Sequence, residues 1–212
     1  MSDIQDAALL HRVPPGPDRG RLFELATEQG GYFTAEQARS SGYGWALLSH
    51  HVKSGRFIRI RRGLYRFTEF PSSRREDVLV AWLAVGKKQA VVSHESALDL
   101  LDLSDLIPNA AHLTVPRSRR NLPSLPGVTI HTTVRPFRSG DLAFREGMVI
   151  TSATRSILDA AEAGAPAEQI ELAVVQAVER GLAVPKQLCE RAALRGKRVA
   201  SLIEGALQKV SA

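Results

Sequence analysis

The stretch LLSHHVKSGRFIRIRRGLYRF, residues 47–67, combines a dense positive charge with a regular apolar pattern. It carries six Lys or Arg side chains and no acidic one. Its first part places Leu48, His51 and Val52 at positions i, i+3 and i+4, the spacing of one face of an amphipathic helix. Gly55, which follows, suits the left-handed position that ends a helix. The stretch therefore predicts a short helix that ends in a tight turn.

The second part of this stretch changes its apolar period from about 3.6 residues to about 2. Ile58 and Ile60 are expected to point to one side and Arg59 and Arg61 to the other, with the residues RRG at the bend of a hairpin. The apolar side chains would hold the hairpin and the preceding helix to one small core. The arginines would stay outside, where phosphate groups can neutralise them.

Two further helices are predicted upstream of this stretch. GRLFELATEQG has apolar residues at helical spacing and ends near Gly30. In the next segment, Thr34 followed three residues later by Gln37 fits a capping box, and Gly42 and Gly44 mark the end of a short helix. Three helices followed by a basic hairpin match the order of a winged helix-turn-helix.

The charge of the whole chain is concentrated in this region. The 212 residues carry a net charge of +6, yet residues 44–75 alone hold eight Lys or Arg and one acid, a local charge of +7. The remainder sums to −1. Charge confined to one region is the electrostatic footprint of a polyanion-binding surface. The single cysteine, the absence of a secretory pattern at the start and the absence of a long apolar run predict a cytoplasmic protein without membrane contact.

The composition changes after a linker, TEFPSSRRE. EDVLVAWLAVG predicts a helix, and VVSHESALDLLDL predicts a strand end or turn that runs into a second helix with Ser93 as N-cap. Three short strands are predicted at AHLTVP, GVTIHTT and GMVIT, and four helices in the rest of the chain. The predicted fold class is α+β, with an N-terminal winged helix-turn-helix, a small sheet and a helical C-terminal end. The domains are expected at 1–18 (flexible lead-in), 19–70 (DNA binding) and 75–212 (α+β effector domain).

The densest group of titratable side chains does not have the spacing of a catalytic or metal site. Glu95, Asp99 and Asp102 would share one face of a helix, as solvated acids usually do, and Asp105 would lie beyond its end. His94, at the helix start, is expected to cap or pack.

Motifs of the enzyme classes that act on nucleic acids are not found. There is no strand-end Asp followed by a Glu-x-Lys pair, no glycine-serine turn with two nearby carboxylates, and no GxxxxGK[ST] or GxGxxG loop. Cys189 falls on an apolar helical stripe and is expected to be buried. We therefore predict a binding protein without catalytic residues, metal ligands or cofactor.

Five segments then point to a family: GGYFTAEQARSSGYGWALLSHHVKSGRFIRIRRGLYRF, SHESALDLLDL, HLTVPRSRR, GVTIHTT and GMVITSATRSILDAA. In this order they resemble the AbiEi family of type IV antitoxins, over roughly residues 19–162. The resemblance implies a winged helix-turn-helix that represses its own operon and a C-terminal antitoxin domain that counteracts a nucleotidyltransferase toxin. It thus implies two partners, double-stranded DNA of the protein's own promoter and a nucleotidyltransferase-like toxin, the latter by direct contact or indirectly.

A winged helix-turn-helix inserts its third helix into the major groove, so side chains off the apolar stripe meet base edges or phosphates there. The predicted DNA-binding residues are Trp45, Ser49, His50 and Lys53 on the helix, and Arg56, Arg59, Arg61, Arg62 and Arg66 in the wing. A further candidate for contact with flanking DNA or an acidic partner is the group Arg117, Arg119 and Arg120, for which a solvated loop is the alternative.

A second class of function stays open for this sequence. The chain could be a stand-alone winged-helix transcription factor whose C-terminal domain binds an unknown ligand or protein. A nucleotidyltransferase-like reading frame beside the gene would favour the antitoxin over this alternative.

Overall fold

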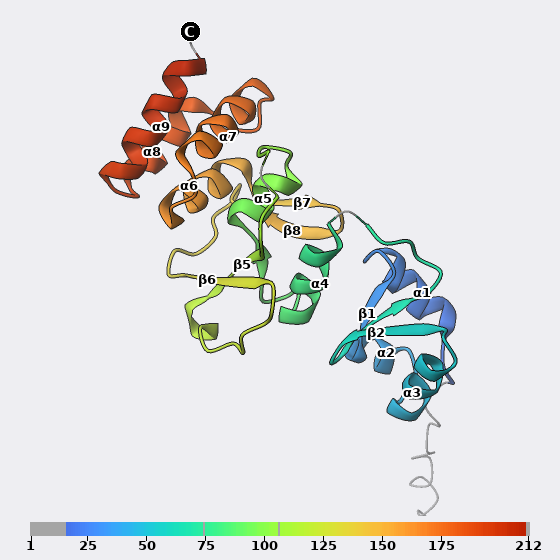
Figure 1. The fold of residues 1–212 in the computed structure, drawn as a ribbon. Helices are drawn as coiled ribbons and strands as arrows, with labels where there is room; N and C mark the ends of the chain where they lie inside the picture. Colours follow the sequence, from blue (N-terminus) through green and yellow to red (C-terminus); the bar gives the residue numbers. More distant parts are fainter. Residues whose placement is uncertain (1–15, 74, 106, 211–212) are drawn as a thin grey trace, which may run out of the picture. The chain divides into compact units, whose positions relative to one another are not determined.

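The computed structural model describes residues 16–73, 75–105 and 107–210 (Figure 1). The chain divides into two compact units, one up to Ser72 and one from Ser73 onward. This division falls in the linker between the two expected domains. Most of the expected lead-in at 1–18 lies outside the described residues. Each unit is described by itself below.

The first unit has the predicted order of a winged helix-turn-helix, which confirms this part of the expected fold class. Its elements are α1 (Arg19–Thr27), β1 (Tyr32–Thr34), α2 (Ala35–Ser40), α3 (Trp45–Lys53), β2 (Phe57–Arg61) and β3 (Leu64–Phe67). The strands form an antiparallel sheet in the order β1-β3-β2. The short strand β1 was not predicted, because its three residues are too few to show an alternating pattern.

Local sequence signals fix the ends of these helices. The Asp18 side chain accepts a hydrogen bond from the Arg21 N–H at 2.9 Å and so caps α1. Thr34 and Gln37 form both bonds of the predicted capping box at the start of α2. Gly55, directly after α3, has a φ of +72°, so the predicted left-handed position is confirmed.

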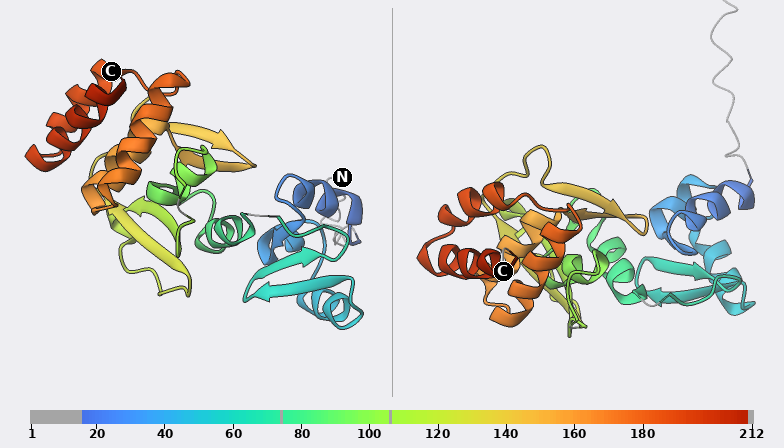
Figure 2. Two further views of the ribbon diagram at one scale, coloured as in Figure 1. Left: turned by 45° about the horizontal axis from the view of Figure 1, so that its top comes forward. Right: turned by 90° about the horizontal axis from the view of Figure 1, so that it is seen from above.

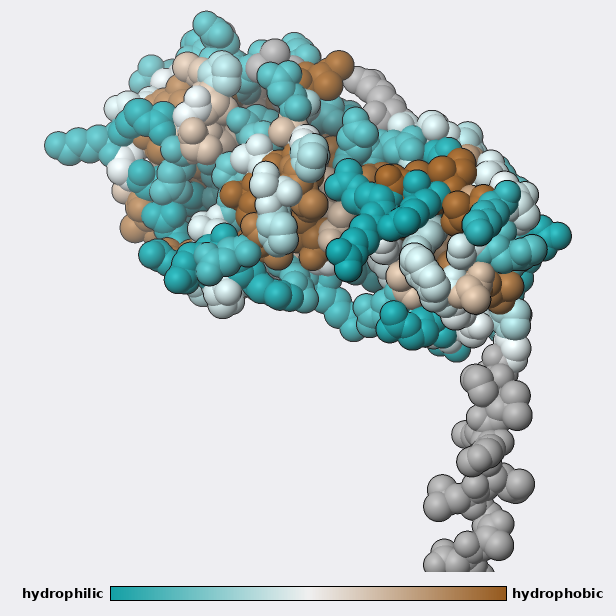
Figure 3. All heavy atoms as spheres, turned by 60° about the horizontal axis from the view of Figure 1, so that its bottom comes forward, coloured by the Kyte–Doolittle hydropathy of each residue, from teal (hydrophilic) through white to brown (hydrophobic). Residues whose placement is uncertain are grey.

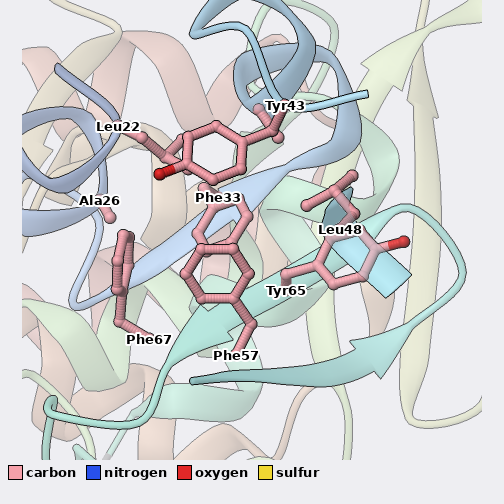
Figure 4. Packing of buried hydrophobic residues seen from close by; sticks show 9 residues of the cluster. Leu22, Ala26, Phe33, Tyr43, Leu48, Phe57, Tyr65 and Phe67 are labelled. Atoms are coloured by element: carbon pink, nitrogen blue, oxygen red, sulfur yellow. The ribbon is translucent and has the colours of Figure 1, made fainter. Parts of the chain in front are cut away.

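Aromatic side chains dominate the core of the first unit. The ring centroid of the fully buried Phe33 lies 4.9 Å from that of Phe57 and 5.2 Å from that of Phe67. Such offset and edge contacts are the favoured arrangement of aromatic rings and bury large areas. Figure 4 shows this cluster, which comprises Leu22, Ala26, Phe33, Ala38, Tyr43, Leu48, Phe57, Tyr65 and Phe67.

The predicted inward face of the hairpin is wrong by one residue. Ile58 is 38% exposed, whereas its neighbour Phe57 is 4% exposed and belongs to the core. Against β3, the strand β2 shifts its register between Arg59 and Arg61. Phe57 and Ile58 pair with β3 before this shift, and because side chains alternate along a strand, a core-facing Phe57 turns Ile58 outward. The paired Phe57 and Phe67 therefore hold the hairpin to the core in place of the isoleucines.

Gly31 allows the tight connection between α1 and β1. Gly31 has a φ of +91°, and a Cβ atom placed there would lie 2.3 Å from Cγ of Phe70. Its carbonyl oxygen accepts a hydrogen bond from the Phe67 N–H at 3.0 Å. No larger side chain fits this position without displacing the ring of Phe70.

The second unit contains a five-stranded mixed sheet in the order β6-β5-β4-β8-β7. Its strands are β4 (Val91–Val92), β5 (Ala111–Pro116), β6 (Val128–Thr133), β7 (Leu142–Arg145) and β8 (Met148–Thr151). The pairs β5–β6 and β4–β8 are parallel, while β4–β5 and β7–β8 are antiparallel. The three predicted strands correspond to β5, β6 and β8. The edge strand β7 was missed, because its four residues lack a clean apolar alternation.

The helices of the second unit are α4 (Glu76–Val85), α5 (His94–Leu100), α6 (Ala153–Ala163), α7 (Ala167–Glu179), α8 (Pro185–Ala193) and α9 (Lys197–Val210), and all six were predicted. Helix α6 is buried from Ala153 to Ala161 and packs against α5. The last three helices pack together beyond α6 (Figures 1 and 2). In the described part of the chain, no helix is long and apolar enough to cross a membrane.

Candidate nucleic-acid interface

The turn between α2 and α3 sets the position of the candidate recognition helix. Gly42 has a φ of +82°, and the N–H of Tyr43 donates to the carbonyl of Ala38 at 2.9 Å, which closes the turn. Leu48 of α3 is 3% exposed and anchors the helix in the core. Gly44 is the N-cap and provides no side-chain bond, so no cap covers the first amides of the helix. These amides suit a phosphate oxygen.

The predicted base-reading residues lie away from this anchor. Trp45 is 70% exposed, His50 and Lys53 are exposed, and Ser49 is half-buried. Trp45, Ser49 and Lys53 follow one another at intervals of four residues, so they share one side of the helix. The exposed ring of Trp45 is therefore accessible to a binding partner. Figure 3 is a view of the whole chain, in which hydrophilic residues predominate and apolar patches lie among them.

The arginines of the wing differ in whether the protein neutralises them. Arg59 and Arg62 are exposed and Arg61 is half-buried. Within residues 16–72, the structure gives these three guanidinium groups no hydrogen bond or ion pair to a protein group. Three unneutralised positive charges on one short hairpin repel one another. An anion bound beside them therefore lowers the electrostatic free energy of the hairpin.

Two other arginines of the unit are already engaged. Arg19 forms an ion pair of 2.7 Å with Glu69. Arg66, a predicted DNA contact, donates to the Tyr32 hydroxyl at 3.4 Å and to Ser72 Oγ at 3.2 Å. Its guanidinium also lies over the ring of Tyr32, 5.6 Å from the centroid. Arg66 is thus held inside the unit to a greater extent than its wing neighbours.

Arg56, the remaining predicted wing contact, borders a cavity of about 300 Å³ that is also lined by Arg19, His51, Phe57 and Glu69. Burial lowers the pKa of His51, and the nearby Arg56 lowers it further. A neutral His51 packs its ring 5.0 Å from that of Phe57. His51 therefore belongs to the packing face of α3, as its spacing predicted, and Arg56 stays exposed at the rim.

The other predicted groups lie in the second unit. Arg117, Arg119 and Arg120 are exposed and follow β5, with Arg117–Arg119 in a single 3₁₀ turn. The side chain of Arg119 donates to Gln89. Cys189 is half-buried, so the expectation of a buried cysteine was wrong.

The acidic residues of α5 are not simply a solvated face, which corrects the prediction. Arg75 bonds Asp99 at 2.8 Å, Asp102 at 2.6 Å and Glu146 at 2.8 Å. The Asp99 side chain is only 14% exposed. These carboxylates therefore tie α5 to the β7–β8 hairpin through one guanidinium.

Comparison with known proteins finds a family model that matches part of the first unit. Residues 21–68 match the model of AbiEi_4, a transcriptional regulator described as an AbiEi antitoxin. The crystal structure of the Rv2827c protein from Mycobacterium tuberculosis is similar, with a TM-score of 0.57 and 17% sequence identity over 91% of this chain and 80% of that chain. At this identity the likeness shows a common fold. No curated protein matches the chain. Over residues 21–68, the chain therefore matches the AbiEi antitoxin family of transcriptional regulators, as its sequence indicated.

Proposed function

We propose that the protein is an autorepressor and antitoxin that binds double-stranded DNA of its own promoter through its first unit. The observation that carries the proposal is the set of wing arginines without a protein partner, beside a helix that exposes Trp45 and Lys53. The family match over residues 21–68 supports a regulatory role.

The binding mechanism follows from where each side chain lies. Helix α3 enters the major groove, where Trp45, Ser49, His50 and Lys53 reach base edges or phosphates. Arg59, Arg61 and Arg62 neutralise backbone phosphates beside the groove, and Arg56 extends this contact from the end of the helix. Repression is steric, because a protein on the promoter excludes the polymerase. No catalytic step is part of this proposal.

The second part of the proposal assigns the antitoxic activity to the second unit. Its proposed partner is a nucleotidyltransferase-like toxin, which is what the resemblance to AbiEi antitoxins implies; the family model itself names an antitoxin only. The test is co-expression of any nucleotidyltransferase-like reading frame that adjoins the gene. Growth should be restored by the full chain and by a chain with a neutralised wing, and residues 1–74 alone should give no protection. A wing variant that loses protection at unchanged protein level would overturn this division of labour.

DNA binding is tested by fluorescence anisotropy with a labelled duplex from upstream of the gene and a shuffled duplex of equal composition. We expect a clear preference for the upstream duplex and a steep salt dependence. Equal affinity for both duplexes would contradict specific repression. The absence of binding at low salt would remove the DNA-binding function altogether.

A second candidate function is a stand-alone transcription factor whose second unit binds a small ligand. One observation favours it: a polar cavity of about 260 Å³ in the second unit. A gene neighbourhood without a nucleotidyltransferase-like reading frame, together with ligand binding by the full chain, would favour this candidate over the antitoxin.

A further inference from the structure

The cavity of the second unit gathers imidazole and guanidinium groups from distant parts of the sequence. It has a volume of about 260 Å³ and lies where β5 and β6, helix α6 and the α8–α9 connection meet. Its polar lining includes His94, His131, Arg135, Arg155, Asp159 and Arg195. The DNA-binding proposal uses none of these residues.

One wall is a chain of imidazoles that starts at a carboxylate. Glu95 Oε2 lies 2.9 Å from His112 Nδ1, and His131 Nε2 lies 3.1 Å from the same nitrogen. Of these three residues only His131 lines the cavity, so Glu95 and His112 lie behind this wall. The ring of His94 stacks on that of His131, with 3.5 Å between the centroids. In the described residues, no group of three or more His, Cys, Asp or Glu side chains is arranged to hold a metal ion.

The stacked pair is uncharged at neutral pH. Burial lowers the pKa of His94 to about 3, with a further contribution from His131. Burial, together with His112, also lowers the pKa of His131. The hydroxyl of Ser93 accepts from Thr114, so its own hydrogen is available to His94 Nδ1 at 2.9 Å. The proton of the neutral His94 ring then sits on Nε2, where it can serve a ligand as a donor.

The backbone of His94 is strained at this position. Its φ is +53°, in the left-handed region that few non-glycine residues adopt, although Asn, Asp and His adopt it more often than the others. His94 is 7% exposed and immediately follows Ser93, the N-cap of α5. Strain of this kind costs roughly 1 to 3 kcal/mol and clusters at functional sites. It is an observation independent of the charges that line the cavity.

The opposite wall is a network of arginines bound to carboxylates. Arg155 Nε and Arg195 Nη1 each donate to Asp159 at 2.7 Å, and Arg135 Nη1 donates to Glu162 at 3.0 Å. Burial alone would lower the pKa of Arg195, but the carboxylates of Asp159 and Glu162 raise it. Arg155 also donates to the buried Asp141 at 3.3 Å, and Arg191 shares that carboxylate. With these two residues included, four guanidinium groups face three carboxylates, so the network carries one excess positive charge.

Donors remain available on this wall. The bonds that the structure gives for the side chains of Arg135 and Arg195 use only Nη1 in each, within the described residues. The side chain of Arg195 is nevertheless only 6% exposed. Each guanidinium carries five N–H groups in a planar fork that matches a phosphate or carboxylate. The remaining donors of Arg135 and Arg195 can therefore serve an anion that enters the cavity.

We propose that this cavity binds a small phosphate monoester. The excess positive charge calls for an anion, and donors from two arginines and His94 suit the three terminal oxygens of a phosphoryl group better than the two of a carboxylate. The volume lies below the roughly 300 to 1,000 Å³ of pockets for drug-sized ligands, so the ester is a sugar phosphate or, at most, a mononucleotide. The inference goes beyond the proposed function and does not depend on DNA binding.

The test is isothermal titration of the full chain with ribose 5-phosphate and with a panel of ribonucleoside 5′-monophosphates. Ribose, the corresponding nucleosides, inorganic phosphate and ribose 5-carboxylate serve as controls. We expect saturable binding of at least one monoester and none of its unphosphorylated counterpart. Comparison of ribose 5-phosphate with the nucleoside monophosphates shows whether the ligand is a sugar phosphate or a mononucleotide. Equal binding of the unphosphorylated compound, of the carboxylate or of inorganic phosphate would overturn the proposal, as would no binding at millimolar concentration.

A matched pair of variants locates the site. Arg135→Gln removes an exposed guanidinium from the cavity and should weaken binding by about tenfold to a hundredfold. Arg138→Gln makes the same change three residues away, outside the lining, and should leave binding unchanged. Unchanged affinity in a folded Arg135→Gln would overturn the assignment to this cavity.

A measurement on the unmodified chain guards against effects of substitution. Long-range ¹H–¹⁵N NMR of the histidine rings should show ligand-dependent shifts for His94 and His131. The ring of His51, in the first unit, is the internal control and should not shift. Shifts confined to His51, or no shifts in the presence of a bound monoester, would place the ligand elsewhere and overturn the proposal.

Discussion

Replacement of Arg59 and Arg62 by alanine tests the central claim that the wing neutralises DNA phosphates. Both side chains are exposed and have no protein partner in residues 16–72, so their loss breaks no contact of the folded state. We expect each change to alter the free energy of unfolding by no more than about 0.5 kcal/mol. The fold should therefore survive while the binding surface loses two charges.

The expected loss of affinity follows from counterion release. Each phosphate contact contributes about 0.9 to the slope of log K against log salt, so the double variant should flatten the slope by about 1.8. At about 0.1 M salt this corresponds to roughly eightfold per contact and about sixtyfold for both. The assay is fluorescence anisotropy with the upstream duplex at four or more salt concentrations, with thermal unfolding of each variant as the check on folding.

Arg19→Ala is the matched control for a single charge. It removes the same charge from the same unit, but this charge is already paired with Glu69 at 2.7 Å. We expect its salt slope to stay close to that of the unmodified protein. An unchanged slope in the Arg59 and Arg62 double variant would refute the reasoning, because the free arginines would then not touch phosphates. An equal loss in Arg19→Ala would also refute it, since net charge alone would explain the effect.

Three further predictions concern the fold and its response to pH. Gly31→Ala should destabilise the first unit by about 2 to 4 kcal/mol in urea unfolding, because its Cβ would collide with Phe70, while Gly55→Ala, at a similar φ with open space, should cost about 1 kcal/mol. Thr34→Ala removes half of the capping box and should cost about 1 kcal/mol by the same measurement. The pKa of His94 is about 3 in the folded protein and about 6.5 in the unfolded chain, so between these values only the unfolded chain binds a proton there. The free energy of unfolding should therefore fall by up to about 1.4 kcal/mol for each pH unit below about 6.5. His94→Asn, which tolerates the positive φ, should flatten this dependence in urea unfolding between pH 7 and 5, and an unaltered slope would contradict the burial of an uncharged imidazole.

The structural features that the sequence predicts correctly are those with a local cause. The capping box of Thr34 and Gln37 needs only residues three apart, and Gly55 needs only its own backbone. The hairpin was correctly located but its inward face was not, because the alternation of arginine and isoleucine is equally regular in either phase. Packing of Phe57 on Phe33 decides the phase, and that contact joins residues far apart in the chain.

For the DNA interface, the sequence showed where the positive charge lies but not which arginines are free of protein partners. In the sequence, nothing distinguishes Arg59 from Arg66 within the basic region, or either of them from Arg19 upstream of it. The ion pair of Arg19 joins residues 50 positions apart, and the bonds of Arg66 to Tyr32 span 34. Only the fold therefore separates arginines that the protein has already neutralised from those that remain for a polyanion.

The cavity of the second unit was missed for the opposite reason, since its charges nearly cancel in the sequence. Outside residues 44–75 the chain sums to −1, which hides a local excess of one positive charge around Arg155 and Arg195. The one available signal was a histidine on each of the neighbouring strands β5 and β6, His112 and His131, whose side chains meet only because the strands pair in parallel.

The two units thus use arginine in different ways. The wing leaves guanidinium groups free so that salt-sensitive contacts form with a long polyanion, whereas the cavity holds them with carboxylates so that buried donors are fixed in place before a small anion arrives. A pre-positioned donor loses little conformational entropy on binding, which is what a small ligand with few contacts requires.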